Sequence, residues 1–318
     1  MREYRGLESV EPEANSIVSI GTFDGVHRGH QQLIDRVKQL SAEVGGPSTL
    51  VTFEPHPQLV VSRPDRPRIR ILTSLEEKRD ILRAHGIDRL VVIDFTPEFA
   101  SMSPQEFVER ILIARIGCRV VVVGPDHGFG RSRGGTIRTL AELGQRFGFG
   151  VEVLPVLEIE EGPVNSTRIR RVLTERGDVA LAERLLGRPY EVRGTVCRGS
   201  GRGRELGFPT ANLTLDTPHK LLPKDGIYAG FVETAGRRYP AAINVGTRPT
   251  FNGSHRVVEA HLVGEVGDLY GTPMRIQFVE RIRDEIAFPT VRDLVEQMQR
   301  DREESLRILQ NYSKSLMA

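Results

Sequence analysis

The sequence contains only two cysteines among its 318 residues, and this scarcity excludes architectures built on sulfur. Cys118 and Cys197 lie far apart along the chain, which fits a reducing cytosol better than a disulfide framework, and two thiols cannot build a cysteine metal site. No apolar stretch approaches membrane-spanning length, and residues 1–5 lack the apolar core of a signal peptide. We therefore expect a cytoplasmic protein that does not enter a membrane.

The chain also lacks an excess of either charge. Its 44 Lys and Arg residues against 42 Asp and Glu residues leave a formal net charge of +2. The field of the whole molecule would then not attract nucleic acid, whereas small anionic ligands need only local positive groups. We expect small-molecule substrates and no nucleic acid partner, and the sequence leaves weak self-association open.

The first half alternates short apolar runs with helical patterns. Pairs such as Ser74 and Glu77 form capping boxes that mark helix starts between these runs. Continuous β-branched runs such as 120–123 are typical of strands buried on both faces of a parallel sheet. The sequence therefore predicts a doubly wound α/β sheet whose ligands bind beyond the carboxyl ends of its strands. The five predicted strands are 17–20, 49–53, 89–93, 120–123 and 151–154.

The pattern changes after residue 165. Two helices are expected, one opened near 166–170 and one by Asp178, and Gly187 ends the helical stretch. We place a domain boundary there, with domains 1–187 and 188–318. Short β-rich runs separated by Gly and Pro then predict an antiparallel barrel or sandwich. A final amphipathic helix should start at Pro289 and pack on it through Val291, Leu294, Val295 and Met298.

Residues 20–31, Ile-Gly-Thr-Phe-Asp-Gly-Val-His-Arg-Gly-His-Gln, join an apolar strand to a helix. A strand, a glycine turn and a helix start together aim backbone N–H groups and a partial positive charge at one point, which favours phosphate. His27 and His30 at this helix start can donate to a phosphate whose charge grows during displacement. The alternative is a capped helix with two surface histidines. We favour the phosphate site, whose turn residues are Gly21, Thr22, Phe23, Asp24 and Gly25.

Three further segments of this half fall near predicted strand ends or a helix start. His56 lies between two prolines that stiffen its loop, and the alternative for it is a structural loop residue. Asp126, in a glycine-rich loop, can accept from a ribose hydroxyl or an adenine amine. Hydroxyl and guanidinium groups at a helix start suit polyphosphate oxygens. The residues singled out are Pro55, His56, Pro57, Asp126, Ser166, Thr167 and Arg168.

The second half holds one dense segment, 194–212, which is not a Walker loop because no Gly-Lys-Ser/Thr closes it. It offers a glycine run with Gly199 and Gly201, followed by Pro-Thr-Ala-Asn. Thr210 and Asn212, two apart on an extended segment, point to the same side and present oxygen ligands suited to Mg²⁺. The alternative is a mobile surface turn.

The motifs 21–30, 52–57 (Thr-Phe-Glu-Pro-His-Pro) and 166–170 (Ser-Thr-Arg-Ile-Arg), in this order, resemble the prokaryotic bifunctional riboflavin kinase/FAD synthetase family. The resemblance implies a nucleotidyltransferase domain that adenylylates FMN, with His27 and His30 contacting ATP phosphates. It also implies that residues 55–57 and Phe129 contact the flavin. One position departs from the family pattern, because His127 stands where the family usually has an aromatic residue.

Gly-Phe-Pro-Thr-Ala-Asn, at 207–212, is similar to the hallmark of riboflavin kinases. This resemblance implies an antiparallel β-barrel kinase domain with a C-terminal helix. It also implies that Glu259, in Glu-Ala-His-Leu, is the general base, that Thr210 and Asn212 hold Mg²⁺, and that Arg283 borders the flavin. The stretch 262–267 departs from the family pattern.

The resulting hypothesis is an enzyme that uses ATP and Mg²⁺ to phosphorylate riboflavin to FMN and to adenylylate FMN to FAD. Two alternatives are retention of only one of these activities and a flavin-binding regulator on the same scaffold. Incubation with riboflavin, ATP and Mg²⁺ separates these alternatives, because it shows whether FMN, FAD or neither is formed.

Overall fold

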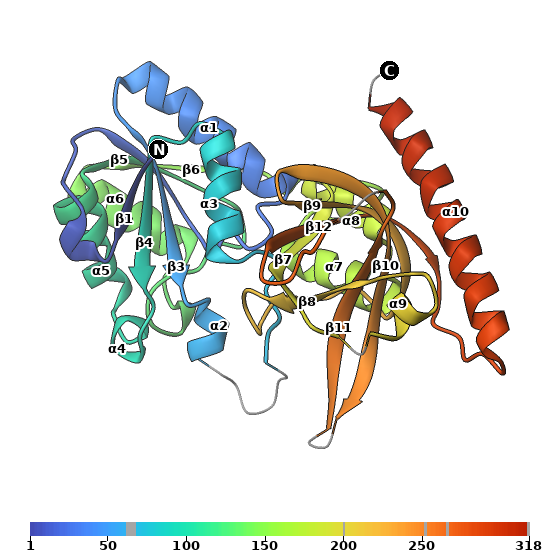
Figure 1. The fold of residues 1–318 in the computed structure, drawn as a ribbon. Coiled ribbons are helices and arrows are strands. Elements are labelled where there is room, and N and C mark those ends of the chain that lie inside the picture. Colours follow the sequence, from blue (N-terminus) through green and yellow to red (C-terminus); the bar gives the residue numbers. More distant parts are fainter. Residues whose placement is uncertain (62–67, 200, 251–252, 265–266, 317–318) are drawn as a thin grey trace. The chain divides into compact units, whose positions relative to one another are not determined.

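The computed structural model describes residues 1–61, 68–199, 201–250, 253–264 and 267–316. They divide into two units, Met1–Ser166 and Thr167–Ala318. The first unit holds the α/β sheet and the second holds a β-barrel (Figure 1).

A six-stranded parallel sheet in the order β1-β4-β3-β2-β5-β6 organises the first unit. This confirms the predicted fold class and adds one strand, β1, which pairs with β4. The sequence of β1, Arg-Glu-Tyr-Arg, is short and polar and gave no apolar run to detect. The strands are β1 (Arg2–Arg5), β2 (Ser16–Ile20), β3 (Ser48–Glu54), β4 (Arg89–Asp94), β5 (Cys118–Val123) and β6 (Gly150–Val153).

Capping residues define the helices between these strands. Ser74 and Glu77 form the expected capping box of α3, and Ser103 and Glu106 form another at α5. Gly117 ends the π-helical stretch Val108–Ile116, which continues α5, in the left-handed conformation. The helices are α1 (Arg28–Val44), α2 (Pro57–Val60), α3 (Leu75–Ala84), α4 (Pro97–Ala100), α5 (Pro104–Phe107) and α6 (Ile137–Phe147).

The sheet is buried on both faces. Successive strand residues alternate between two cores, as Val121 and Val122 do. Val121 packs with residues of the 104–116 helical segment and α6, and Val122 packs with Val37 and Leu40 of α1. The continuous apolar runs of the strands follow from this double coverage.

The strand order reverses beside β2. From β2 the chain moves to β3 and β4 on one side, and it then crosses to β5 on the other side. Ligands of open α/β sheets bind beyond the carboxyl ends of the strands at this kind of switch point. Residues 21–27 follow β2 and residues 124–130 follow β5, so both segments start at that place.

The second unit begins with helices and closes into a barrel. Asp178 caps α8 and Gly187 ends it, as expected. The strands form a closed barrel in the order β10-β11-β8-β7-β12-β9, so the structure is a barrel and not a sandwich. The elements are α7 (Ser166–Arg171), a π-helical turn (Val172–Arg176), α8 (Val179–Leu186), β7 (Tyr190–Cys197), α9 (Arg202–Glu205), β8 (Ala211–Leu215), β9 (Gly226–Thr234), β10 (Arg237–Thr250), β11 (Gly253–Leu262), β12 (Pro273–Arg283) and α10 (Val291–Ser315).

Both α7 and α8 group almost entirely with the barrel, whereas the predicted domain boundary follows residue 187. The boundary that we placed at the end of the helical stretch, after Gly187, stays a prediction.

The C-terminal helix α10 packs on the barrel through its second half, and of the expected residues Leu294, Val295 and Met298 are half-buried. Thr290 caps the helix, and Ile308 and Leu309 join a core with Phe231 of the barrel. The expectation for Val291 was wrong, because its side chain is 63% exposed. The apolar spacing of the first turns gave the helix correctly but could not say which turns meet the barrel.

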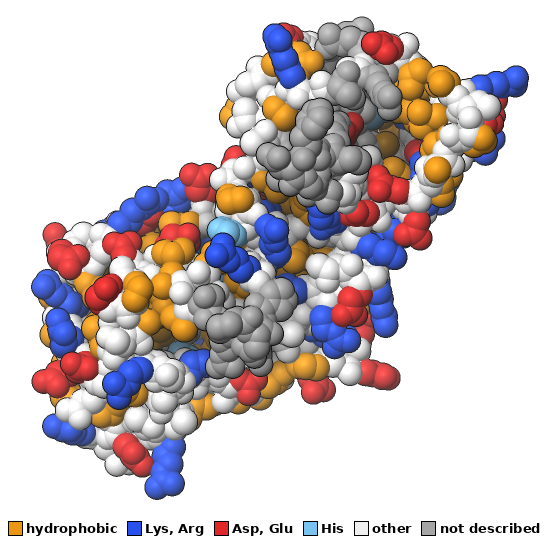
Figure 2. Space-filling model, turned by 90° about the horizontal axis from the view of Figure 1, so that it is seen from below, with side chains coloured by type: hydrophobic (Ala, Val, Ile, Leu, Met, Phe, Trp, Pro, Cys, Tyr) orange, Lys and Arg blue, Asp and Glu red, His pale blue; other side chains and the backbone are white. Residues whose placement is uncertain are grey.

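Acidic and basic side chains are interspersed on the face drawn in Figure 2, in both units. This distribution agrees with the nearly balanced charge of the sequence. An anionic ligand would therefore be bound by positive groups at its own site and not by the charge of the whole surface.

The α10 contact yields a stability prediction. Leu309→Ala should lower the free energy of unfolding of the second unit by about 3 kcal/mol, because the side chain is buried and leaves a cavity. Leu316→Ala is the matched control, since Leu316 is 66% exposed and Leu309 only 3%. Urea unfolding followed by tyrosine fluorescence reports this unit, because the chain has no Trp and its tyrosines here are Tyr190, Tyr228, Tyr239, Tyr270 and Tyr312. Equal losses in the two variants would contradict the packing.

Candidate active sites

The turn after β2 has an unusual backbone. Gly25 has φ +86°, which glycine accepts, but Phe23 and Val26 also have positive φ values, 45° and 37°. A β-branched residue such as Val26 rarely adopts this conformation, so the surroundings must hold the turn in place.

The carboxylate of Asp24 provides part of that hold. It is buried and accepts the backbone N–H groups of Leu72 at 2.9 Å and Thr73 at 3.0 Å. In return, the Gly25 N–H donates to the Thr73 hydroxyl at 2.9 Å. These hydrogen bonds hold the segment before α3 against the turn. The carboxylate of Asp24 therefore stabilises the conformation of the turn.

His27 and His30 lie where the sequence placed them, at the start of α1. His27 is the N-cap, and its Nδ1 accepts the backbone N–H of His30 at 3.3 Å. The two imidazoles are stacked with their centroids 3.6 Å apart. An Nδ1 that accepts a hydrogen bond leaves the proton of the neutral ring on Nε2, so His27 presents an Nε2–H donor.

Ser166 reaches the same turn from the far end of the first unit. Its hydroxyl donates to the Asp24 carbonyl at 2.8 Å. Thr167 and Arg168 follow directly in α7 and belong to the second unit. The structure thus ties the start of the 166–170 motif to the turn through Ser166.

The loops after β3 and β5 contain the other predicted residues. His56 caps α2 by accepting the Gln58 N–H at 3.2 Å, between Pro55 and Pro57. Asp126 is exposed, and its backbone carbonyl accepts from Arg133 at 2.8 Å. Phe129 lies in the sheet core.

His127 stands beside Phe129 with the rings stacked, their centroids 5.8 Å apart and their planes 20° from parallel. Burial, with a smaller contribution from Arg133, lowers the pKa of His127 from 6.5 to about 4. The ring is therefore neutral near pH 7 and packs as a planar group. A neutral, planar ring can thus pack at the position where the family resemblance led us to expect an aromatic residue.

In the barrel, strand pairing places Glu259 between two asparagines. Glu259 on β11 lies opposite Asn212 on β8 and opposite Asn244 on β10. Residues directly opposite in antiparallel strands share one face, so the three side chains form a row. Val258 and Ala260 on either side are buried in the barrel, which puts Glu259 on the other face.

Thr210 joins this row, because its hydroxyl donates to the Glu259 carboxylate at 3.3 Å. A Cβ at Gly199 would lie 2.2 Å from the Asn212 amide nitrogen, so a larger residue there would displace the Asn212 side chain. Gly201 follows in the turn before α9. The hydroxyl, amide and carboxylate oxygens at this place are the hard ligands that Mg²⁺ prefers. The donor set therefore fits the metal ion expected from the sequence.

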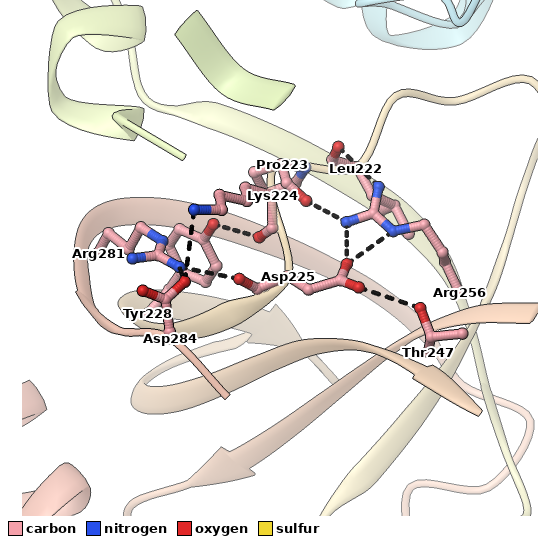
Figure 3. A network of polar contacts seen from close by, with 9 residues as sticks. All are labelled: Leu222, Pro223, Lys224, Asp225, Tyr228, Thr247, Arg256, Arg281 and Asp284. Atoms are coloured by element: carbon pink, nitrogen blue, oxygen red, sulfur yellow. Dashed lines mark hydrogen bonds and ion pairs between the residues drawn. The ribbon is translucent and has the colours of Figure 1, made fainter. Parts of the chain in front are cut away.

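A polar network supports the neighbouring segment 222–225 (Figure 3). Arg256 donates to the backbone carbonyls of Leu222 and Pro223 and to the Asp225 carboxylate. Thr247 donates to the same carboxylate at 3.0 Å. This network fixes the entry to β9 against β10 and β11.

Arg283 is engaged within the barrel unit. Its guanidinium makes two hydrogen bonds to the Asp301 carboxylate, at 2.9 and 2.5 Å, and lies 6.0 Å from the Phe288 ring centroid. It thereby links β12 to α10. Of the departing stretch 262–267, residues 265–266 lie outside the described residues.

Sequence reasoning missed two residues that support these sites. His261 contacts the Pro209 carbonyl through Nδ1 at 3.0 Å and so fixes the segment before Thr210. Lys78 of α3 is buried beneath the turn after β2 and donates to the Thr22 carbonyl. The available signal for Lys78 was its position on the apolar stripe of α3, three residues after Leu75 and four before Leu82.

The histidine-bearing turn at the switch point and the barrel row of hydroxyl, amide and carboxylate groups define a two-unit nucleotide-dependent transferase. A family model described as FAD synthetase matches residues 9–168, and one described as riboflavin kinase matches residues 186–309. The chain belongs to the bifunctional riboflavin kinase/FMN adenylyltransferase family.

Two curated relatives are similar along nearly their whole length. The bifunctional riboflavin kinase/FMN adenylyltransferase of Bacillus subtilis is 35% identical over 308 residues, which cover 96% of this chain and 96% of that protein. The protein of the same name from Pseudomonas fluorescens is 36% identical, over 92% of this chain and 93% of that one.

One solved structure is similar over the same extent. A crystal structure described as a macrolide-efflux protein from Streptococcus pneumoniae has a TM-score of 0.86 and 32% identity, and it covers 96% of this chain and 98% of that one. Within the described residues of this chain, no helix has the length and apolar character needed to cross a membrane.

The depressed pKa of His127 predicts an acid sensitivity. The unfolded chain, with an ordinary histidine pKa near 6.5, binds a proton more readily than the folded chain, with a pKa of about 4. The stability contributed by the neutral ring is thus present above about pH 6.5 and is lost as pH falls through about 4.

His127→Phe should therefore lose less stability than the unaltered chain between about pH 7 and pH 4.5. Urea unfolding followed by circular dichroism at several pH values measures this. Parallel pH profiles in the two proteins would contradict the assignment.

Proposed function

We propose that the barrel unit phosphorylates riboflavin to FMN and that the α/β unit adenylylates FMN to FAD, with ATP as co-substrate in both steps. One observation carries this proposal. A single chain holds both the stacked pair His27 and His30 at the sheet's switch point and the Thr210–Glu259 contact on the barrel. The proposed domains are 1–187 and 188–318, and a cytoplasmic location and weak self-association stay predictions.

In the adenylyltransfer step, a phosphate oxygen of FMN attacks the α-phosphorus of ATP. The bond from that phosphorus to the bridging oxygen breaks, and pyrophosphate leaves. The imidazole N–H groups of His27 and His30, with the amides at the start of α1, donate to the phosphate oxygens as their charge grows. Gly21–Gly25, Asp126 and Ser166–Arg168 bind the nucleotide, and residues 55–57 and Phe129 border the flavin.

In the kinase step, the carboxylate of Glu259 takes the proton of the ribityl 5′-hydroxyl, whose oxygen attacks the γ-phosphorus while ADP leaves. Thr210 and Asn212 would hold Mg²⁺ through their hydroxyl and amide oxygens. When bound, the ion supplies positive charge for the phosphoryl oxygens. Gly199 and Gly201 let the backbone approach the phosphates, and Arg283 borders the flavin through the β12 end it stabilises.

His30→Ala should reduce FAD formation from FMN and ATP by roughly 10²- to 10³-fold, because a preorganised donor to the reacting phosphate is lost. FMN formation from riboflavin should persist, since the barrel site is unaltered. Chromatographic separation of the flavins measures both activities in one incubation. His85→Ala, at the C-terminal end of α3, is the control. A loss of both activities with an intact fold would contradict two separate sites.

Glu259→Gln should have the opposite effect. FMN formation should fall by roughly 10²- to 10⁴-fold, because the amide cannot accept the hydroxyl proton. FAD should still form when FMN is supplied. Glu280→Gln is the matched control, because Glu280 is an exposed glutamate on β12. Unchanged FMN formation in Glu259→Gln would remove Glu259 from the role of general base.

A further inference from the structure

A buried cation lies beneath the turn that carries His27. The side chain of Lys78 is only 4% exposed. Its Nζ donates to the Thr22 carbonyl at 2.6 Å and to the Thr52 hydroxyl at 3.0 Å. The Thr52 hydroxyl in turn donates to the same carbonyl at 3.2 Å. Three elements, α3, β3 and the turn after β2, therefore meet at one carbonyl oxygen.

Burying an ammonium group is costly, so such a lysine needs compensation. Burial lowers the pKa of Lys78, and the nearby carboxylates of Asp24 and Glu54 oppose this shift. Burial also raises the pKa of Glu54. Glu77, the acidic neighbour on α3, is engaged in capping Ser74. The ammonium group of Lys78 is thus held by one carbonyl oxygen and one hydroxyl oxygen. The charges of Asp24 and Glu54 stabilise it further.

The hydrogen bond to Thr22 fixes the direction of one peptide group. In a trans peptide the C=O and the following N–H point to opposite sides. Because the Thr22 carbonyl points toward Lys78, the N–H of Phe23 points away from it. Successive amides oriented in this way form concavities that bind anions.

We propose that Lys78 is a positioning residue of the adenylyltransfer reaction, which holds the Thr22–Phe23 peptide so that its N–H faces the phosphates of ATP. The inference rests on the proposed function of this site. Lys78 acts through the turn, and Thr52 is the second support of the same carbonyl. The positive φ of Phe23 and Val26 is maintained by this support together with the Asp24 contacts.

Four variants test the role. Lys78→Met removes the donors at similar length, Lys78→Arg retains the charge, and Thr52→Val removes the bridging hydroxyl. Lys38→Met is the matched control, because Lys38 is an exposed lysine on α1. Each is assayed for FAD formation from FMN and for FMN formation from riboflavin, with kcat and the KM for ATP determined separately.

Lys78→Met should lower kcat/KM for FAD formation by roughly 100-fold, with FMN formation and Lys38→Met unchanged. Thr52→Val should lose less, and Lys78→Arg should restore part of the activity. A charged ammonium donates stronger hydrogen bonds than a neutral amine, and burial lowers the pKa of Lys78, so FAD formation by the unaltered enzyme should decline at alkaline pH. In Lys78→Arg this decline should move to higher pH, because a guanidinium stays charged.

FAD formation by Lys78→Met at the unaltered rate would overturn the proposal. If Lys78→Met does not fold, the pH profile of Lys78→Arg decides, and an alkaline decline that does not move overturns it equally. A merely structural lysine would change the melting temperature but leave that profile in place. Failure of the unaltered enzyme to make FAD from FMN, ATP and Mg²⁺ would instead contradict the proposed function itself.

Discussion

The first unit depends on one constraint, the burial of a parallel sheet on both of its faces. Helices pack on both faces of the sheet. Val121 and Val122 of β5, for example, point to opposite cores. Buried faces leave the carboxyl edge of the strands as the place where polar groups can gather. The turn after β2 starts at this edge, at the switch point, and its strained backbone is fixed by Asp24 and Lys78. Strand order and buried polar contacts together determine where His27 presents its ring.

In the barrel, the position of the site depends on the pairing register of the strands. Pairing sets Glu259 opposite Asn212 and Asn244, and the neighbouring Val258 and Ala260 face the core. A slip of one residue would exchange these faces, so the hydrophobic core holds the carboxylate in place. The Arg256–Asp225 network further secures the strands beside it (Figure 3).

Local signals predicted much of this from sequence. The capping box at Ser74, the β-branched run of β5 and the helix start at His27 each depend on neighbouring residues, and the structure has all three. Contacts between distant segments were beyond such signals. The polar strand β1 is specified by its pairing with β4, and the exposure of Val291 depends on which turns of α10 meet the barrel. The position of Lys78 on the apolar stripe of α3 indicates burial, but only the packing of α3 beneath the turn shows which carbonyl it contacts.

The hydrogen bond from Ser166 to the Asp24 carbonyl links the nucleotide turn to the residue at which the first unit ends. The chain thus enters the second unit directly after a residue whose side chain is hydrogen-bonded to the backbone of that turn. The position of the Asp24 carbonyl and the conformation of the residue that precedes the second unit therefore depend on each other.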